Sequence, residues 1–231
     1  IGMDVNGTDD LRVRFLDGGT FKGGIQVATT ADDLVAGTAD GDLGIRTQGN
    51  MLFSSGGNVA RFTIASDGSL STPTAGTSNV RFGVNAGNSI ASGGNYNVVV
   101  GDEAGTAITT GDENVAVGFN SLAAIDTGLH NVSVGSRALQ ADVKGNYSTA
   151  IGKNALTTQS FSTATDAYNT AVGYAAGAAV TTGTANTLIG GLAGDALTIG
   201  AANVAIGTSA LGADTKGVHN VAIGYLALDA Q

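Results

Sequence analysis

The chain has 231 residues, of which 37 are glycine, one is proline and none is cysteine, and its net charge is −9. The acidic balance argues against a nucleic-acid-binding protein, which needs a basic stripe, and against docking on an anionic membrane. The absence of cysteine excludes a disulfide scaffold, and no run approaches the ~18 apolar residues of a membrane-spanning helix. A hydrophobic fraction of 42% with only 13% charged residues is typical of tightly turned β-structure with glycine at its corners.

Residues 1–71 contain no repeat and predict a small antiparallel β domain. Residues 11–15 (LRVRF) alternate apolar and polar side chains and end at Asp17-Gly18-Gly19, so they predict a half-buried strand. Further strands are predicted around Ile25 and Val27, around Leu43 and Ile45, and at 51–54 and 60–65, the last two joined by a hairpin turn at Ser55-Gly56-Gly57-Asn58. The lone Pro73 marks the change of pattern and predicts a linker at 72–77.

Residues 78–231 repeat one five-residue phrase nine times, and six of the eight intervals between copies are 17 residues long. A fixed internal period of this kind predicts a solenoid. The last residue of the phrase is always glycine: Gly83, Gly101, Gly118, Gly135, Gly152, Gly173, Gly190, Gly207 and Gly224. Four residues earlier stands asparagine in eight copies, namely Asn79, Asn97, Asn114, Asn131, Asn169, Asn186, Asn203 and Asn220, whereas the fifth copy has Ser148.

Each copy predicts one coil of a β-solenoid. The Val-x-Ile pattern is β-branched with period two, so it predicts a short strand whose two β-branched side chains, such as Ile206, face the buried core. The glycines mark corners, and the asparagines are expected to bond the backbone locally and the asparagine of the coils above and below. Nine coils at a strand spacing of about 4.8 Å give a stack about 43 Å tall.

The residue between the two β-branched side chains is expected to face away from that core. It is often alanine (Ala116, Ala150, Ala171, Ala205 and Ala222). A row of small side chains lets another backbone approach closely, so we expect it to pack against the same row of identical chains around a three-fold axis. A monomeric solenoid with alanine on a solvent face is the alternative.

Two phrases, NTAVGYAAG at 169–177 and NVAIGYLAL at 220–228, resemble the head repeats of trimeric autotransporter adhesins, and they resemble the repeat arrays of phage tail fibres more closely. The stretch at 40–70, DGDLGIRTQGNMLFSSGGNVARFTIASDGSL, is similar to segments upstream of the repeats in phage tail fibres. The resemblance implies a parallel homotrimeric fibre of left-handed β-roll coils. Its implied partners are two further copies of the chain, other virion proteins and a host cell-surface receptor, either glycan or protein.

The longest departure from the 17-residue period predicts a receptor-contact loop. One interval is 21 residues long, with the extra four residues within 157–168. Regular coils have little freedom to vary, so an insertion is expected to bulge outward, where binding residues commonly lie. Phe161 and Tyr168 are its aromatic residues and the candidate contacts. The alternative is a tolerated insertion with Phe161 packed against a neighbouring chain.

Candidates for metal binding and catalysis are weak, and we predict no metal, no cofactor and no catalytic residue. His130 and His219 each precede a repeat asparagine, but neither has a second ligand at metal spacing. The acidic run of Asp32, Asp33, Asp40 and Asp42 lacks a calcium-loop pattern, and the glycine-rich stretches lack the phosphate-loop lysine. Only Asp102–Glu103 and Asp112–Glu113 pair acids, and adjacent strand residues point to opposite faces.

The leading interpretation is therefore a non-enzymatic, structural and adhesive protein: a phage tail fibre or appendage shaft, on the virion and extracellular, that presents host-receptor contacts. The main alternative is the head region of a bacterial trimeric adhesin on the cell surface. A glycan-degrading tailspike is a third. A bacterial adhesin is expected to continue into a coiled-coil stalk and membrane anchor, whereas a phage fibre is expected to begin with a virion-attachment segment.

Overall fold

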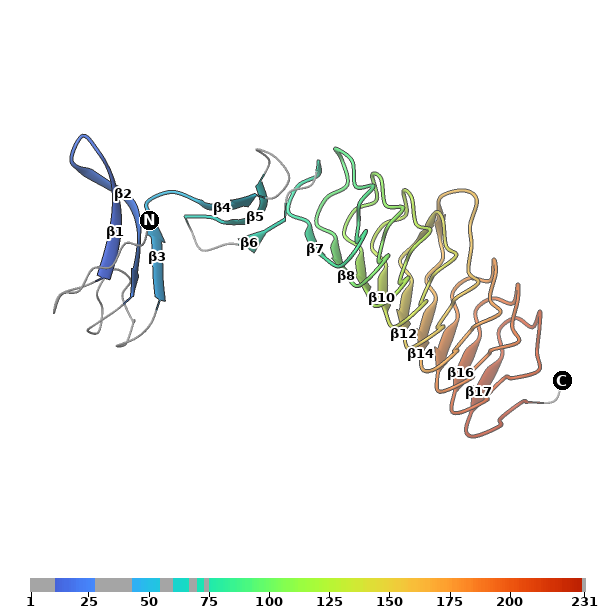
Figure 1. The fold of residues 1–231 in the computed structure, drawn as a ribbon. Coiled ribbons are helices and arrows are strands. Elements are labelled where there is room, and N and C mark those ends of the chain that lie inside the picture. Colours follow the sequence, from blue (N-terminus) through green and yellow to red (C-terminus); the bar gives the residue numbers. More distant parts are fainter. Residues whose placement is uncertain (1–10, 28–42, 55–59, 67–69, 73–74, 230–231) are drawn as a thin grey trace. The chain divides into compact units, whose positions relative to one another are not determined.

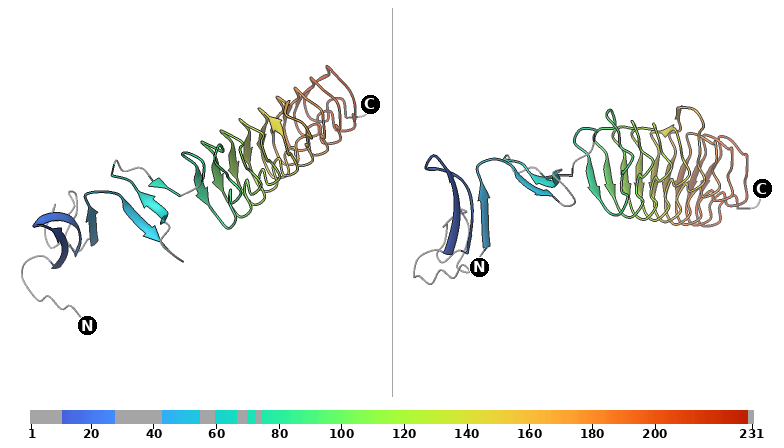
Figure 2. Two further views of the ribbon diagram at one scale, coloured as in Figure 1. Left: turned by 90° about the horizontal axis from the view of Figure 1, so that it is seen from above. Right: turned by 45° about the horizontal axis from the view of Figure 1, so that its top comes forward.

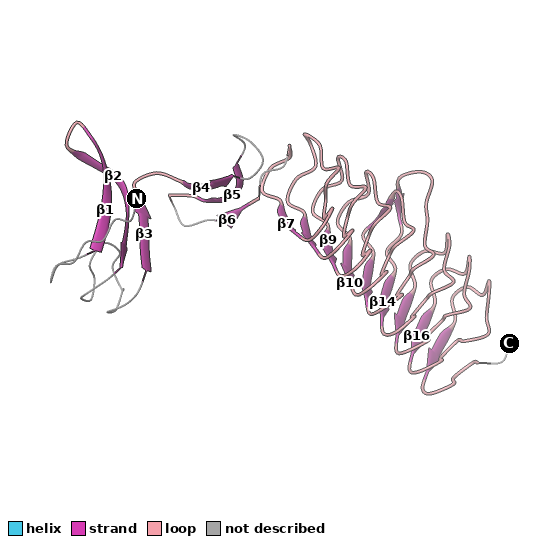
Figure 3. Ribbon diagram, viewed as in Figure 1, coloured by secondary structure: helices cyan, strands magenta, loops and turns pink. Residues whose placement is uncertain are grey.

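The computed structural model describes residues 11–27, 43–54, 60–66, 70–72 and 75–229. The regular secondary structure of these residues consists of β-strands, without helices (Figures 1 and 3). The chain divides into two compact units, residues 1–73 and 74–231, and the division falls inside the predicted linker.

The first unit contains two three-stranded antiparallel sheets. One has the order β1 (Leu11–Asp17), β2 (Thr20–Val27), β3 (Leu43–Thr47), and the other has the order β4 (Met51–Ser54), β5 (Ala60–Ile64), β6 (Leu70–Ser71). Many of their large apolar side chains are exposed in the single chain: Phe15, Leu16, Ile25, Leu43, Ile45, Leu52, Phe53 and Leu70. The hairpin turn at 55–58 and the acidic run at 32–42 lie outside the described residues.

The second unit is a parallel β-solenoid, which confirms the fold predicted from the repeat. Nine short strands form one parallel sheet and delimit eight complete turns (Figure 2). Residues 17 apart are paired, as in Val98↔Val115 and Val115↔Val132. The strands are β7 (Val80–Phe82), β8 (Val98–Val100), β9 (Val115–Val117), β10 (Val132–Val134), β12 (Thr149–Ile151), β14 (Thr170–Val172), β15 (Thr187–Ile189), β16 (Val204–Ile206) and β17 (Val221–Ile223).

The prediction of which strand face is buried is wrong. The central residue of each strand from β8 to β17 faces the core and is fully buried or nearly so: Val99, Ala116, Ser133, Ala150, Ala171, Leu188, Ala205 and Ala222. The flanking Val, Thr and Ile side chains point outward, and Ile206 is 36% exposed rather than buried. The reason is volume. A single coil is narrow, and leucine and isoleucine from its other side already fill most of the interior, so the strand usually contributes only a methyl group.

Packing inside the coils is complementary in size. In the coils of Ala116 and Ala205 the small inward residue is accompanied by a buried leucine, Leu122 or Leu211. The coil of Ala171 instead has Gly177 there, and leucines of the neighbouring coils lie against it. Where the inward residue is Leu188, that place is taken by Gly194, and a Cβ there would lie 2.8 Å from the Leu188 Cδ2 atom. The core is therefore closely packed in every coil, although its large side chain changes position.

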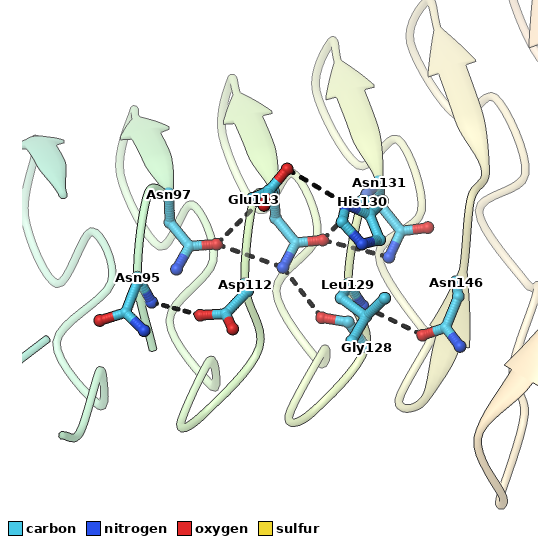
Figure 4. Close-up of polar contacts among 10 residues, drawn as sticks. Asn95, Asn97, Asp112, Glu113, Gly128, Leu129, His130, Asn131 and Asn146 are labelled. Carbon is cyan, nitrogen blue, oxygen red and sulfur yellow. Dashed lines mark hydrogen bonds and ion pairs between the residues drawn. The ribbon is translucent and has the colours of Figure 1, made fainter. Parts of the chain in front are cut away.

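The repeat asparagines form a buried ladder along one corner of the stack (Figure 4). The backbone N–H of each donates to the side-chain oxygen of the asparagine one coil earlier, as from Asn114 to Asn97 at 2.9 Å and from Asn131 to Asn114 at 3.0 Å. The side-chain N–H of Asn114 also donates to the carbonyl of Gly128 at 2.9 Å. The same backbone bond joins Asn203 to Asn220. These bonds satisfy amides that would otherwise be buried without partners.

The glycines that end each strand turn the chain at a second corner. Gly101, Gly118, Gly135, Gly207 and Gly224 have φ between +125° and +133°, a region that L side chains rarely adopt. At Gly118 a Cβ would also lie 2.8 Å from the carbonyl oxygen of Gly135 in the next coil. Glycine is therefore required here both by the backbone conformation and by the close approach of the next coil.

Candidate receptor-contact site

The coil that carries the insertion is also the coil in which the asparagine ladder is interrupted. Ser148 occupies the asparagine position, and its backbone N–H still donates to the side-chain oxygen of Asn131 at 2.9 Å. Its hydroxymethyl side chain is too short to reach Asn169 in the next coil, so the ladder needs another amide at this point.

Gln159, which stands 17 residues after Asp142 and just before the extra residues, supplies that amide. Its Oε1 atom accepts a hydrogen bond from the side-chain N–H of Asn169 at 2.8 Å. Its Nε2 atom donates to the Ser148 hydroxyl at 2.9 Å and to the Asp142 carboxylate at 2.6 Å. Gln159 is fully buried. Gln159 therefore compensates for the asparagine that Ser148 replaces.

Asp142 is a buried carboxylate in the core of the preceding coil. It stands 17 residues after Ile125 in a core column that is apolar in most coils and polar again at Gln159 and Asp214. Its Oδ1 atom accepts the backbone N–H groups of Gly145 at 3.0 Å and Phe161 at 3.4 Å. Burial nevertheless raises the pKa of Asp142 above its usual value, against the opposing effect of these bonds. Aligning the repeats by their asparagines would have revealed Asp142 and Gln159 as consecutive polar residues in a mostly apolar column.

The inserted segment is tied to the stack on both sides of an exposed tip at residues 162–164. It adds a two-stranded parallel sheet, β11 (Gly145–Asn146) with β13 (Thr165–Asp166). Phe161 is only 6% exposed, and this burial comes from its own chain. The structure therefore corrects the prediction that Phe161 contacts a receptor, because an inserted aromatic side chain gains more from burial than from exposure to water.

Tyr168 is exposed and ends a stack of aromatic rings. The His130 and Tyr147 rings lie 4.9 Å apart with an interplanar angle of 11°, and the Tyr147 and Tyr168 rings lie 5.3 Å apart at 12°. All three residues immediately precede the asparagine position of a coil and have positive φ, between 50° and 59°. Below them, the Glu113 carboxylate lies 3.3 Å from the His130 Nδ1 atom (Figure 4).

Polar groups surround the Tyr168 ring on one side. Its hydroxyl donates to the Oδ2 atom of Asp166 at 3.4 Å, and the Oδ1 atom of Asp166 accepts from Asn146 at 3.0 Å. The negative charge of Asp166 raises the pKa of the Tyr168 hydroxyl. The phenol is thus neutral at physiological pH, and the site offers a flat ring, a hydroxyl and a carboxylate. These groups are suited to binding a ligand rather than to reacting with one.

The other residues considered from sequence have local structural roles. Asp112 accepts the backbone N–H of Asn95 at 2.6 Å while its neighbour Glu113 faces His130, so these two acids do not act together. His219 is exposed in the same column as His130. Across the residues that the structure describes, no three His, Cys, Asp or Glu side chains gather as a metal site, and no helix is long and apolar enough to cross a membrane.

No protein-family model matches the chain, and comparison with curated proteins and with solved structures gives no significant match.

Proposed function

We propose that the chain is a structural and adhesive fibre protein, most simply a phage tail fibre or appendage shaft. In this proposal three parallel copies assemble through the outward face of the solenoid sheet, and the assembled fibre presents contacts to a host cell-surface receptor. Association of parallel copies through this face is the part that the geometry supports best. The number three, the left-handed coil and the virion location follow from the resemblance to phage tail fibres.

The supporting observation is the chemistry of the outward sheet face. Each of the nine strands directs two side chains outward, and none of these residues is charged. One of the two columns is entirely apolar: Phe82, Val100, Val117, Val134, Ile151, Val172, Ile189, Ile206 and Ile223. A continuous exposed apolar surface marks an interaction site, and its extension along the whole stack favours a partner of equal length lying parallel to it.

The first unit supports the same proposal. Its two antiparallel sheets leave large apolar side chains such as Phe15, Leu43 and Leu52 exposed in the single chain. Small sheets need a packed apolar face for independent stability. Identical copies of the chain would provide that face, so we propose that the predicted N-terminal β domain forms its core between three chains.

Native mass spectrometry of the purified chain tests the assembly. We expect a mass of three times 22.6 kDa. Ile206→Asp is the informative variant because this side chain lies on the surface of one chain but inside the proposed interface. In the single chain the substitution should cost about 1–2 kcal/mol, because the Ile206 side chain is 36% exposed, whereas an unpaired charge in an apolar interface costs several kcal/mol. We therefore expect a folded monomer.

Thr208→Asp is the matched control. Thr208 is exposed in the same coil but lies beyond the sheet, after the corner glycine. This variant should remain trimeric. A wild-type chain that stays monomeric at micromolar concentration would refute the assembly, and an Ile206→Asp variant that is still trimeric would place the interface elsewhere.

The head of a bacterial trimeric surface adhesin would use the same sheet face, so location must separate the two functions. Antibodies raised against the chain should label the tails of phage particles in electron micrographs. Labelling of bacterial surfaces in cells that carry no phage would favour the adhesin instead.

A further inference from the structure

In the column of residues that precede the ladder asparagines, large side chains give way to alanine after Tyr168. From Glu113 the column continues through His130, Tyr147 and Tyr168, each stacked on or paired with the one before. The next two residues of the column are Ala185 and Ala202. The stack of rings therefore ends at Tyr168, and only methyl groups follow in the next two coils.

One face of the Tyr168 ring is consequently open. Tyr147, which has a ring on each side, is 41% exposed, whereas Tyr168, which has a ring on one side, is 56% exposed. Two alanine coils at a strand spacing of about 4.8 Å leave about 10 Å of height beyond Tyr168 along the column. That is enough room for a ring to stack on Tyr168 as Tyr168 stacks on Tyr147.

The ring is held in place before any ligand arrives. Stacking on Tyr147 and the hydrogen bond from the Tyr168 hydroxyl to Asp166 both restrict the side chain. A side chain that is already ordered loses little conformational entropy when a ligand binds to it. The open face is therefore a preorganised platform.

The polar groups beside this platform select the kind of ring. An ionised carboxylate has about four acceptor positions, and the structure gives Asp166 two donors, Asn146 and the Tyr168 hydroxyl. Asp166 thus retains capacity to accept hydroxyl groups of a ligand, and its charge repels anions. A neutral ring with an apolar face and several hydroxyl donors matches this chemistry, which is that of a neutral pyranose.

We propose that the open face of Tyr168, on the side of Ala185 and next to Asp166, binds a neutral sugar ring of a cell-surface glycan. The inference deepens the receptor-contact role and rests on the proposed function in that respect. The site itself uses residues of one chain only, so sugar binding is measurable whether or not the chain is a trimer.

Saturation-transfer NMR with the full chain tests the site. The probes are the methyl glycosides of glucose, galactose and N-acetylglucosamine, with N-acetylneuraminic acid as the anionic comparison. We expect saturation of the ring protons of at least one neutral probe and none of the anionic one. Tyr168→Ala should weaken binding about tenfold, which corresponds to the worth of one aromatic stacking contact. Ala185→Leu should weaken it similarly by covering the open face.

Two further variants separate stacking from a general loss of structure. Tyr174→Ala removes a tyrosine of the same exposure, 56%, outside the column, and should leave sugar binding unchanged. Tyr168→Phe keeps the ring and should retain most of the binding. Circular dichroism and native mass spectrometry of each variant establish that fold and assembly are intact.

Three results would overturn the proposal: no neutral probe binds the wild-type chain, Tyr168→Ala binds as well as wild type, or only the anionic probe binds. A trimer that binds no sugar would refute the site and leave the fibre function standing. A monomer that binds sugar through Tyr168 would do the reverse.

Discussion

A double substitution tests whether Gln159 substitutes for the missing ladder asparagine. Gln159→Ala removes the bridging amide, and Ser148→Asn restores the asparagine of the repeat. Each change alone should destabilise the solenoid. Gln159→Ala breaks the bridging hydrogen bonds, and in Ser148→Asn the introduced asparagine and Gln159 cannot share the space, because the Gln159 amide lies 2.9 Å from the Ser148 hydroxyl. Together they should be compatible, with the introduced asparagine taking the ladder position.

The magnitudes follow from the bonds involved. Gln159→Ala removes a bond to the Asp142 carboxylate, worth about 1.5–3 kcal/mol, and bonds to Asn169 and Ser148 worth about 1 kcal/mol each. Ser148→Asn alone overpacks the core, at a cost of about 1–3 kcal/mol. Independent effects would add to about 5–8 kcal/mol. We expect the double variant to lose only about 1.5–3 kcal/mol, because only the bond to Asp142 stays broken.

Urea unfolding followed by circular dichroism, at one fixed protein concentration, measures the four free energies of the cycle. Gln140→Ala is the control: the same chemical change on a half-buried residue of the neighbouring coil, where about 0.5–1 kcal/mol is expected. Single effects that add within about 0.5 kcal/mol in the double variant would refute the account of Gln159.

Two other predictions concern the core. Leu188→Ala should cost about 2–5 kcal/mol in unfolding experiments, and adding Gly194→Leu should recover part of it, because the coils of Ala116 and Ala205 hold leucine at that place; no recovery would contradict size complementarity. Asp142 has a raised pKa, so the folded chain keeps this proton just above pH ~3.9, where the unfolded chain has lost it. The contribution of the protonated Asp142 side chain to stability is full below pH ~3.9 and is lost as the pH rises through its folded-state pKa. Asp142→Asn should therefore reduce the decrease of the urea midpoint with pH above pH ~4. The same decrease in the variant and in wild type would argue against this role of Asp142.

The period of the repeat was sufficient to predict the solenoid and the strand positions within each coil. A 17-residue interval with β-branched residues two apart leaves few other structures. The asparagine ladder was also accessible, since an amide that recurs once per coil has the same amide above and below it.

The face of the strands that is buried could not be predicted from the period. Alternation separates two faces but does not say which is inside. Choosing the larger residues for the core is sound for an isolated soluble chain, but Ile206 and its equivalents point outward because the coil interior is too narrow for them. The wrong choice therefore came from ranking the two faces by side-chain size without asking how much volume a 17-residue coil encloses.

The candidate site was predicted in part for a related reason. The insertion was visible as a 21-residue interval, but sequence alone treated Phe161 and Tyr168 alike. They differ because Gln159 turns inward to repair the ladder and Phe161 follows it, while Tyr168 has already returned to the regular column. Comparing each residue with its equivalent in the preceding coil, Asp142 for Gln159 and Tyr147 for Tyr168, would have separated a buried polar core position from a stacked surface position.

The column that contains Tyr168 also gives each surface residue a defined height on the solenoid. Each coil contributes one residue to the column. Tyr147, Ala202 and His219 therefore lie at fixed heights, and each coil adds one strand spacing to the height. Because the glycine corners and the amide ladder hold the coils, a substitution in this column changes what is displayed at one height without altering the heights of the others. The residue number therefore gives the height along the solenoid axis, in steps of about 4.8 Å per coil.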